Sequence, residues 1–189
     1  MSRTGADSDD WSVGLVDTGK QTLTGSRVKR LQPWLREETF MVTYGDGVAD
    51  VDLHELFRFH RQQGRVATVT AVRPPARFGG LILAGEEVAS FTEKPSAGEG
   101  WINGGFLVFE PEVFDYLQPD DCSLEAHVLE RLAAERQLSA FRHDRFWQCM
   151  DTLREKNYLE QVWNQGDAPW KTWADPPKLL ESLPWRKAA

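Results

Sequence analysis

The sequence predicts an α/β fold in which a mixed, mainly parallel sheet is flanked by helices. Two short apolar runs rich in Val and Thr, at residues 40–44 and 66–72, have the length and composition of buried strands. Between them, residues 53–63 place apolar side chains at three- and four-residue steps, the pattern of a helix with one buried face. A strand, a helix and a strand in this order form a right-handed crossover, whose two strands run in the same direction.

The first of these runs ends in Gly45-Asp46-Gly47. Open α/β sheets bind ligands at the carboxyl ends of their parallel strands, so this position offers a carboxylate to a ligand or a metal ion. The flanking glycines lack a Cβ and let a phosphate or metal come close to the backbone. A strand-to-helix turn with a solvated aspartate explains the same residues.

The composition limits the class of protein. With 189 residues, 41% hydrophobic and 27% charged, the chain has an ordinary globular composition and the length for one core. A net charge of -7 argues against a general nucleic-acid partner, which would need a basic surface. Two cysteines give no disulfide framework and suit a reducing compartment. The sequence shows no run of membrane-spanning length and no secretory signal, so we expect a cytoplasmic protein with no membrane partner.

The first thirty residues predict an arm, a strand and a basic cluster. Residues 1–10 are polar and acidic and form a disordered arm, whereas residues 11–17 alternate loosely enough to form a strand. In residues 24–30, next to a flexible glycine, the basic side chains are Arg27, Lys29 and Arg30. Such a cluster holds a phosphate or forms a solvated helix face, and the residues alone leave both interpretations open.

The helix over residues 53–63 has start and stop signals. Asp52 is the predicted N-cap, with an acid at the capping-box spacing, and Gly64 supplies the stop. His54 and His60 lie on this helix without a Cys or an acid at metal-ligand spacing, so both are interpreted as structural or solvated.

A β-hairpin and an acidic and basic pair follow. Residues 81–83 and 88–91 are predicted to be short strands around a turn. Beyond them, Pro95 disfavours the helical conformation at Lys94 and holds Glu93 and Lys94 in an extended segment.

Asn103-Gly104-Gly105 begins the next buried strand, which runs to residue 109. An Asn beside two glycines offers a hydrogen-bond donor and an acceptor where the backbone can approach closely. This arrangement suits sugar hydroxyls, although each of these short motifs is weak by itself.

The next part of the chain predicts two helices, a strand and a second acidic strand end. Residues 111–117 and 124–137 are predicted helices, the second capped by a serine, and residues 138–142 a strand. An apolar run then ends in Asp151, which is either a second ligand carboxylate or the N-cap of a helix that continues to Trp163.

Residues 166–189 form a tail rich in Trp and Pro. The prolines exclude a regular helix, while the tryptophans are too apolar to remain in water. We therefore expect the tail to pack on its own domain or on a neighbouring subunit, and we expect a homo-oligomer.

Seven separated motifs agree in sequence and order with one family. From about residue 11 to residue 173, the chain closely resembles the glucose-1-phosphate cytidylyltransferases, within the sugar-nucleotide pyrophosphorylase family. The motifs that carry the resemblance are residues 15–19, 24–27, 44–50, 78–79, 93–95, 103–105 and 146–154.

This resemblance implies the Rossmann-like nucleotide-diphospho-sugar transferase fold and a reaction that joins CTP and α-D-glucose 1-phosphate into CDP-glucose and pyrophosphate. It implies that Asp46 and Asp151 hold Mg²⁺ at the nucleotide's phosphates and that Lys94 binds the sugar phosphate, so these three are the expected catalytic residues. The substrate-binding residues it implies are Gly25, Arg27, Tyr44, Gly45, Glu93, Asn103 and Gly104. The product of such enzymes feeds deoxysugar synthesis for cell-surface polysaccharides such as O-antigen.

The residue types suit this chemistry. Attack of a sugar phosphate oxygen on the α-phosphorus of CTP brings two anions together, so the protein has to neutralise charge and align the reactants. Mg²⁺ prefers one or two carboxylates plus substrate oxygens, and Lys94 supplies a point charge. A general base is unnecessary, and no His partner is indicated that would make Cys149 a nucleophile.

The glycine-rich loop with which the family begins, and which cradles the triphosphate, has no counterpart in this sequence. We therefore hypothesise an N-terminally incomplete enzyme, with a partial nucleotidyltransferase domain over residues 11–165. Whether such a chain is active by itself, and which base it selects, the sequence leaves open.

Two other functions fit the same pattern. A metal-dependent glycosyltransferase also combines a Rossmann-like sheet with an acidic metal site, but it uses a nucleotide-sugar as its donor. A non-catalytic assembly or regulatory module would keep the sugar-facing half of the fold and the aromatic tail.

Overall fold

The computed structural model describes residues 12–74, 80–92 and 100–173. Contacts divide the chain into a large unit, Met1–Gly45 with Asp52–Asp144, and a small unit, Asp46–Val51 with Arg145–Ala189. Each unit is described by itself. The predicted arm over residues 1–10 and the end of the predicted tail lie outside the described residues.

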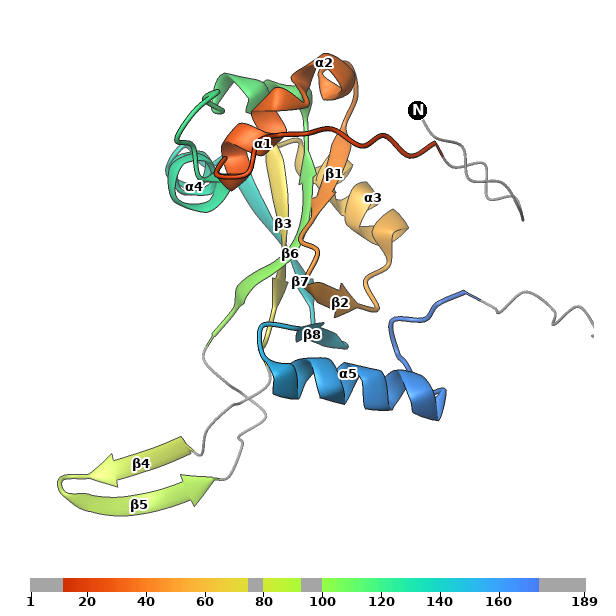
Figure 1. Cartoon of the computed structure of the whole chain (residues 1–189). Helices are drawn as coiled ribbons and strands as arrows, with labels where there is room; N and C mark the ends of the chain where they lie inside the picture. The colour runs from red at the N-terminus through yellow and green to blue at the C-terminus, as the bar shows by residue number, and fades with distance from the viewer. Residues whose placement is uncertain (1–11, 75–79, 93–99, 174–189) are drawn as a thin grey trace, which may run out of the picture. The chain divides into compact units, whose positions relative to one another are not determined.

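The large unit contains a four-stranded mixed sheet with the order β1-β6-β3-β7 (Figure 1). Its strands are β1 (Phe40–Thr43), β3 (Ala67–Val72), β6 (Ile102–Phe109) and β7 (Leu138–His143). Strand β6 is antiparallel to both β1 and β3, while β3 and β7 are parallel. Three of the four strands therefore run in the same direction, as the predicted crossover requires. The expected mixed α/β sheet is confirmed, but β6 lies between β1 and β3 and makes two of the three pairings antiparallel.

Strand β1 is an edge strand among the described strands, which differs from the prediction of a buried strand in a parallel sheet. It pairs with β6 and with no other described strand, and only Phe40 is buried along it. Met41 remains 41% exposed. The apolar run identifies a strand, but a run of four residues does not reveal how many neighbours that strand has.

Helix α3 (Leu53–Gln63) covers one face of this sheet. The Asp52 side chain accepts hydrogen bonds from the backbone N–H groups of the second and third helical residues, and Gly64 ends the helix with φ 59°. Both predicted signals are confirmed. The helix buries Leu56 and His60, which are 1% exposed each.

His60 is a structural residue of this interface, as its sequence context predicts. Its Nδ1 atom lies 2.8 Å from Thr68 Oγ1, and its Nε2 atom lies 3.2 Å from a carboxylate oxygen of Glu110 without hydrogen-bond alignment. Burial lowers the pKa of His60 below its ordinary value, although the Glu110 carboxylate opposes this shift. Burial therefore disfavours the protonated imidazole inside the fold.

We expect acid to destabilise the large unit through His60. Because the folded state binds this proton less readily than the unfolded chain, the stability is complete above the unfolded pKa of about 6.5 and falls as the pH drops below it. Urea unfolding between pH 7.5 and 5.5 measures the effect. His60→Gln should flatten this pH dependence, whereas His54→Gln, at an exposed position of the same helix, should preserve it. An unchanged slope in His60→Gln would contradict the assignment.

Short helices cover the opposite face of the sheet (Figure 1). They are α1 (Thr24–Arg30), α2 (Gln32–Leu35), η1 (Pro111–Asp115), η2 (Leu124–Leu129) and α4 (Glu130–Ala134). Their apolar side chains form the main core against β1, β3 and β6, with Phe109, Val113, Val128 and Leu132 fully buried. The predicted helix over residues 124–137 is a π-helical turn followed by an α-helical one, and Ser123 caps it as expected.

The predicted β-hairpin is confirmed by β4 (Gly80–Ala84) and β5 (Glu87–Thr92). Gly85 lies in the connecting turn with φ 66°, a conformation that favours glycine. The predicted strand over residues 11–17 is wrong for residues 12–17, which form no strand. Leu15 is 94% exposed there, so alternation in that segment does not reflect a buried face.

The small unit contains two short strands and one long helix. Strands β2 (Gly47–Ala49) and β8 (Trp147–Cys149) pair antiparallel, and α5 (Leu153–Gln165) ends at Gly166 with φ 82°. The prediction of Asp151 as the N-cap is wrong. Thr152 caps the helix in a complete capping box with Glu155, so capping does not account for Asp151.

Within the part of the chain that the structure describes, no helix combines the length and the apolar character that crossing a membrane requires.

Candidate functional site

The two predicted metal ligands lie on neighbouring chain segments of the small unit. Asp46 immediately precedes β2, and its carbonyl oxygen accepts a hydrogen bond of 2.7 Å from the backbone N–H of Met150. Asp151 follows Met150 directly, so the β2 and β8 pairing brings the backbones of the two aspartates together. Both residues are exposed. This adjacency is the feature that sequence reasoning could not derive from the two separate motifs.

Cys149, Asp151 and Glu155 place one potential ligand atom each within 4.8 Å of one another. The carboxylate of Glu155 takes part in capping α5. One of its oxygens accepts hydrogen bonds from the backbone N–H groups of Asp151 and Thr152 at 3.0 and 2.9 Å. Asp46 does not belong to this group of three.

In the large unit, the predicted sugar ligand Asn103 belongs to a hydrogen-bonded network. Its side-chain amide donates to the hydroxyl of Tyr44 at 3.2 Å, and its side-chain oxygen accepts from the backbone N–H of Gly105 at 2.9 Å. The Tyr44 hydroxyl in turn donates to Glu125 at 2.5 Å. Asn103 and Tyr44, predicted from motifs 59 positions apart, are therefore in contact.

Glu125 anchors this network and was missed by sequence reasoning. Besides the Tyr44 hydroxyl, its carboxylate accepts from the hydroxyls of Thr24 at 2.8 Å and Ser123 at 2.9 Å. Burial would raise the pKa of Glu125, but the hydrogen bonds from Tyr44, Thr24 and Ser123 outweigh it and lower the pKa. The only sequence signal is an acid in the first turn of the helix that Ser123 caps, which is an ordinary helix feature.

The predicted nucleotide segment, Gly25 to Arg27, forms the first turns of α1. The Arg27 guanidinium donates to the Thr18 hydroxyl at 2.6 Å and to the Lys20 carbonyl at 3.3 Å. The other two basic side chains of this cluster also have protein partners, Phe114 for Lys29 and Asp120 for Arg30. These three side chains therefore connect α1 to neighbouring segments of the chain. Neither the phosphate-binding interpretation nor the solvated-face interpretation describes this role.

Gly25 is required for close packing. A Cβ at this position would lie 2.8 Å from the Cys122 carbonyl oxygen and 3.1 Å from the Leu124 nitrogen, both of which are backbone atoms. The backbone N–H of Ser26 also donates to that carbonyl at 3.0 Å. The helix and the segment before η2 therefore approach too closely for any larger residue.

We expect Gly25→Ala to lower the free energy of unfolding by about 1–3 kcal/mol, because backbone has to move to accept the methyl group. Gly14→Ala is the control, since a Cβ there meets nothing within 4 Å. Chemical denaturation of both variants measures the difference. Equal stability of the two would show that the contact at Gly25 relaxes without cost.

The other predicted glycines differ from one another. Gly104 faces Val72, whose Cγ1 would lie 2.7 Å from an added Cβ, so it packs against the sheet. Gly45 has open space around it. Gly105 has φ 79° and lies beside the Tyr44 ring, and the motif therefore shapes the backbone around Tyr44 and Asn103. Glu93 and Lys94 lie outside the described residues.

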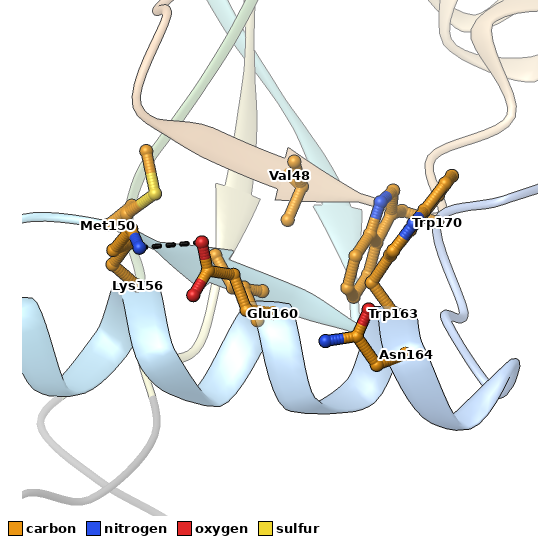
Figure 2. A pocket seen from close by; sticks show the side chains of 8 residues that line it. Val48, Met150, Lys156, Glu160, Trp163, Asn164 and Trp170 are labelled. Atoms are coloured by element: carbon orange, nitrogen blue, oxygen red, sulfur yellow. Dashed lines mark ion pairs between the residues drawn. The ribbon is translucent and has the colours of Figure 1, made fainter.

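An apolar cavity of about 450 Å³ lies in the small unit (Figure 2). Its walls include the rings of Trp163 and Trp170, which stack at 6.4 Å between centroids, and Trp170 also stacks on Phe146 at 5.3 Å. Lys156 and Glu160 form an ion pair of 2.6 Å at the cavity. The first residues of the aromatic tail thus pack on their own unit, while residues 174–189 lie outside the described part.

Comparisons with known proteins agree with this fold. Residues 23–167 match the nucleotidyl transferase family. A glucose-1-phosphate cytidylyltransferase of Salmonella typhimurium is 48% identical over 166 residues, which cover 87% of this chain and 65% of the relative. The catalytic subunit beta of mannose-1-phosphate guanylyltransferase from Dictyostelium discoideum is 32% identical over 127 residues, which cover 65% of this chain and 35% of the relative.

Solved structures show the same fold at low sequence identity. A Bacillus anthracis protein assigned as a glucose-1-phosphate thymidylyltransferase superposes with a TM-score of 0.57 at 14% identity, over 84% of this chain and 65% of that one. HddC from Yersinia pseudotuberculosis superposes with a TM-score of 0.55 at 18% identity, over 76% of this chain and 64% of that one.

This chain spans 65% of the length of its Salmonella relative. The family match nevertheless extends over most of the sequence, from α1 to the end of α5. It includes both aspartates and the network around Asn103. The chain therefore belongs to the nucleotidyl transferase family.

Proposed function

We propose that this chain acts in the transfer of a cytidylyl group from CTP to α-D-glucose 1-phosphate, which yields CDP-glucose and pyrophosphate. The observation that carries the proposal is the pairing of β2 with β8, which brings the backbone of Asp46 to that of the segment carrying Asp151. The 48% identity to a glucose-1-phosphate cytidylyltransferase supports the choice of substrates.

We propose Asp46 and Asp151 as the residues that hold Mg²⁺. Both are exposed carboxylates on adjacent segments, and a donor set of one or two carboxylates completed by substrate oxygens is what Mg²⁺ prefers. When bound, the ion would neutralise charge on the nucleotide's phosphates. Cys149 does not belong to this set, since its sulfur is too soft a ligand for Mg²⁺.

Asn103 would bind sugar hydroxyls, with its orientation set by neighbours. Its amide is held by Tyr44 and by the backbone of Gly105, so it adopts one orientation before any ligand arrives. Tyr44 is held by Glu125, which makes the tyrosine and the carboxylate positioning residues. A binding group fixed in this way loses little conformational entropy when it binds.

The reaction needs no proton transfer at its central step. An oxygen of the sugar phosphate is already an anion, and it forms a bond to the α-phosphorus of CTP as the bond to the pyrophosphate oxygen breaks. Lys94, the proposed ligand of the sugar phosphate, would reduce the repulsion between the two anions. The rate then depends on alignment and charge neutralisation.

Product formation tests the proposal. The full chain is incubated with CTP, glucose 1-phosphate and Mg²⁺, and CDP-glucose and pyrophosphate are measured by ion-exchange chromatography and a coupled phosphate assay. Equal amounts of both products are expected, and UTP and GTP in parallel reactions report the choice of base. Calorimetry with CDP-glucose gives a binding readout that does not depend on turnover.

The alternatives give different results in the same experiment. Consumption of CDP-glucose without pyrophosphate release would indicate a glycosyltransferase. The absence of product, of CDP-glucose binding and of any shift in the melting temperature would indicate an assembly or regulatory module. Either result contradicts the proposal.

We also propose a cytoplasmic homo-oligomer that supplies CDP-glucose for deoxysugars of cell-surface polysaccharide such as O-antigen. The exposed rings of Trp163 and Trp173, at 45% and 55%, support an association surface in the small unit. Light scattering coupled to size-exclusion chromatography measures the mass in solution. A monomer at micromolar concentration would contradict this part.

A further inference from the structure

Two arginines lie over one tryptophan ring in the large unit. The guanidinium carbon of Arg73 is 4.7 Å from the centroid of the Trp101 ring, and that of Arg142 is 5.6 Å from it. Each distance is within the range of a cation–π interaction. The ring therefore gathers two positive charges in a chain whose net charge is -7.

Neither arginine is neutralised by a carboxylate among the residues that the structure describes. In contrast, Arg61 and Arg131 have carboxylate partners, Glu110 at 2.8 Å and Glu135 at 2.9 Å. Arg73 and Arg142 are both exposed, so their remaining N–H groups can reach a ligand. A bound anion would be attracted by both guanidinium groups.

The cluster lies where the strands of this sheet end. Arg73 directly follows β3 and Arg142 is the second-last residue of β7, and these two strands are parallel. The carboxyl ends of parallel strands form the usual ligand edge of an open α/β sheet. Trp101 directly precedes β6, which runs the other way and so begins at this same edge.

The cluster also shares a face of the sheet with Asn103. Asn103 and Arg142 are both paired with Ala71, one on each side of β3, so the three lie in one row across the sheet. Trp101 and Arg73 each stand one residue beyond the ends of β6 and β3, and extending the side-chain alternation of the strands to them puts both on the face of Asn103.

We infer that Arg73 and Arg142, held on Trp101, bind the phosphate group of a sugar phosphate whose hydroxyls lie toward Asn103. Guanidinium groups suit phosphate because their N–H donors match its oxygens in pairs. The identification of the ligand as a sugar phosphate rests on the proposed function. The anion site itself rests on the two arginines and Trp101.

Calorimetry without Mg²⁺ or nucleotide tests the inference on the full chain. Glucose 1-phosphate, inorganic pyrophosphate and glucose are titrated into the unchanged protein and into the double variant Arg73→Gln, Arg142→Gln. The control is Arg36→Gln, Arg58→Gln, which removes the same charge from exposed arginines that already have carboxylate partners. Melting temperatures establish that all three proteins are folded.

We expect the double variant to bind glucose 1-phosphate about 10-fold or more weakly and the control to bind it within twofold of the unchanged protein. Arg142→Lys should give an intermediate loss, because lysine keeps the charge without the paired donors. If the double variant loses affinity for pyrophosphate but not for glucose 1-phosphate, the anion site is supported. Its ligand is then pyrophosphate and not the sugar phosphate.

Equal binding by the double variant and the unchanged protein would overturn the inference, as would the absence of phosphate binding by the unchanged protein. These outcomes are separate from the proposed reaction. A chain that forms no CDP-glucose can still lose glucose 1-phosphate binding in the double variant. A double variant that retains full CDP-glucose formation and full affinity would overturn the anion site alone.

Discussion

Replacing Asp46 with Asn is expected to lower the rate of CDP-glucose formation by about 100-fold, which corresponds to about 2.7 kcal/mol of transition-state stabilisation. Asparagine keeps the size of the side chain and its place beside β2 but removes the charge that a Mg²⁺ ligand needs. The backbone contact between Asp46 and Met150 does not involve the side chain, so the fold should be preserved.

Initial rates over a range of Mg²⁺ concentrations measure this effect, and Mg²⁺ calorimetry gives a comparison that does not need turnover. Asp167→Asn is the matched control, since it removes one exposed carboxylate from the same unit just beyond α5. Asp151→Asn should behave like Asp46→Asn. If Asp46→Asn keeps its rate and its Mg²⁺ affinity within threefold of the unchanged chain, the proposed metal site is wrong.

Replacing Glu125 with Ala is expected to lower the free energy of unfolding by about 1–3 kcal/mol and to weaken glucose 1-phosphate binding by about 10-fold. Three hydroxyls, those of Tyr44, Thr24 and Ser123, lose their acceptor at once. Tyr44 then no longer has a fixed position, and Asn103 loses the neighbour that orients its amide.

The pH dependence of this effect distinguishes the carboxylate from simple packing. The folded state lowers the pKa of Glu125 below its usual value of 4.5, so its stabilisation is complete above that value and is lost as the pH falls through the folded pKa. The stability difference between the unchanged chain and Glu125→Ala should therefore be largest near pH 7 and shrink in acid. Glu125→Gln should recover part of the binding, and Glu130→Ala, exposed on α4, should change neither quantity. A difference that does not vary with pH would contradict the charged role.

Local signals in the sequence were sufficient for elements whose cause is local. Asp52 caps α3 and Gly64 ends it because their side-chain chemistry acts within one turn of the helix. The capping prediction failed at Asp151, where Thr152 is also a good cap and stands one residue later. Two adjacent candidates cannot be separated by propensity alone, because the choice depends on where β8 ends.

Strand order could not be derived in the same way. The crossover rule gives β1 and β3 the same direction, which is correct, but it does not show that β6 inserts between them. Strand β2 was missed because three residues beginning with Gly47 carry no strand signal. Pairing with β8 stabilises that segment, and β8 is about a hundred positions away in the chain.

The sequence by itself determined the family and indicated the two acidic motifs and the Asn103 motif, because each is a short run of residue types that the proposed chemistry would use. The tertiary structure decided which of them meet. Pairing of β2 with β8 brings the segments of Asp46 and Asp151 together, and the fold brings Tyr44, Asn103 and Glu125 into one network. It also gathered Arg73 and Arg142 on the ring of Trp101, although no motif contains these residues. Contacts between distant positions depend on strand register and packing, which no local pattern of residues specifies.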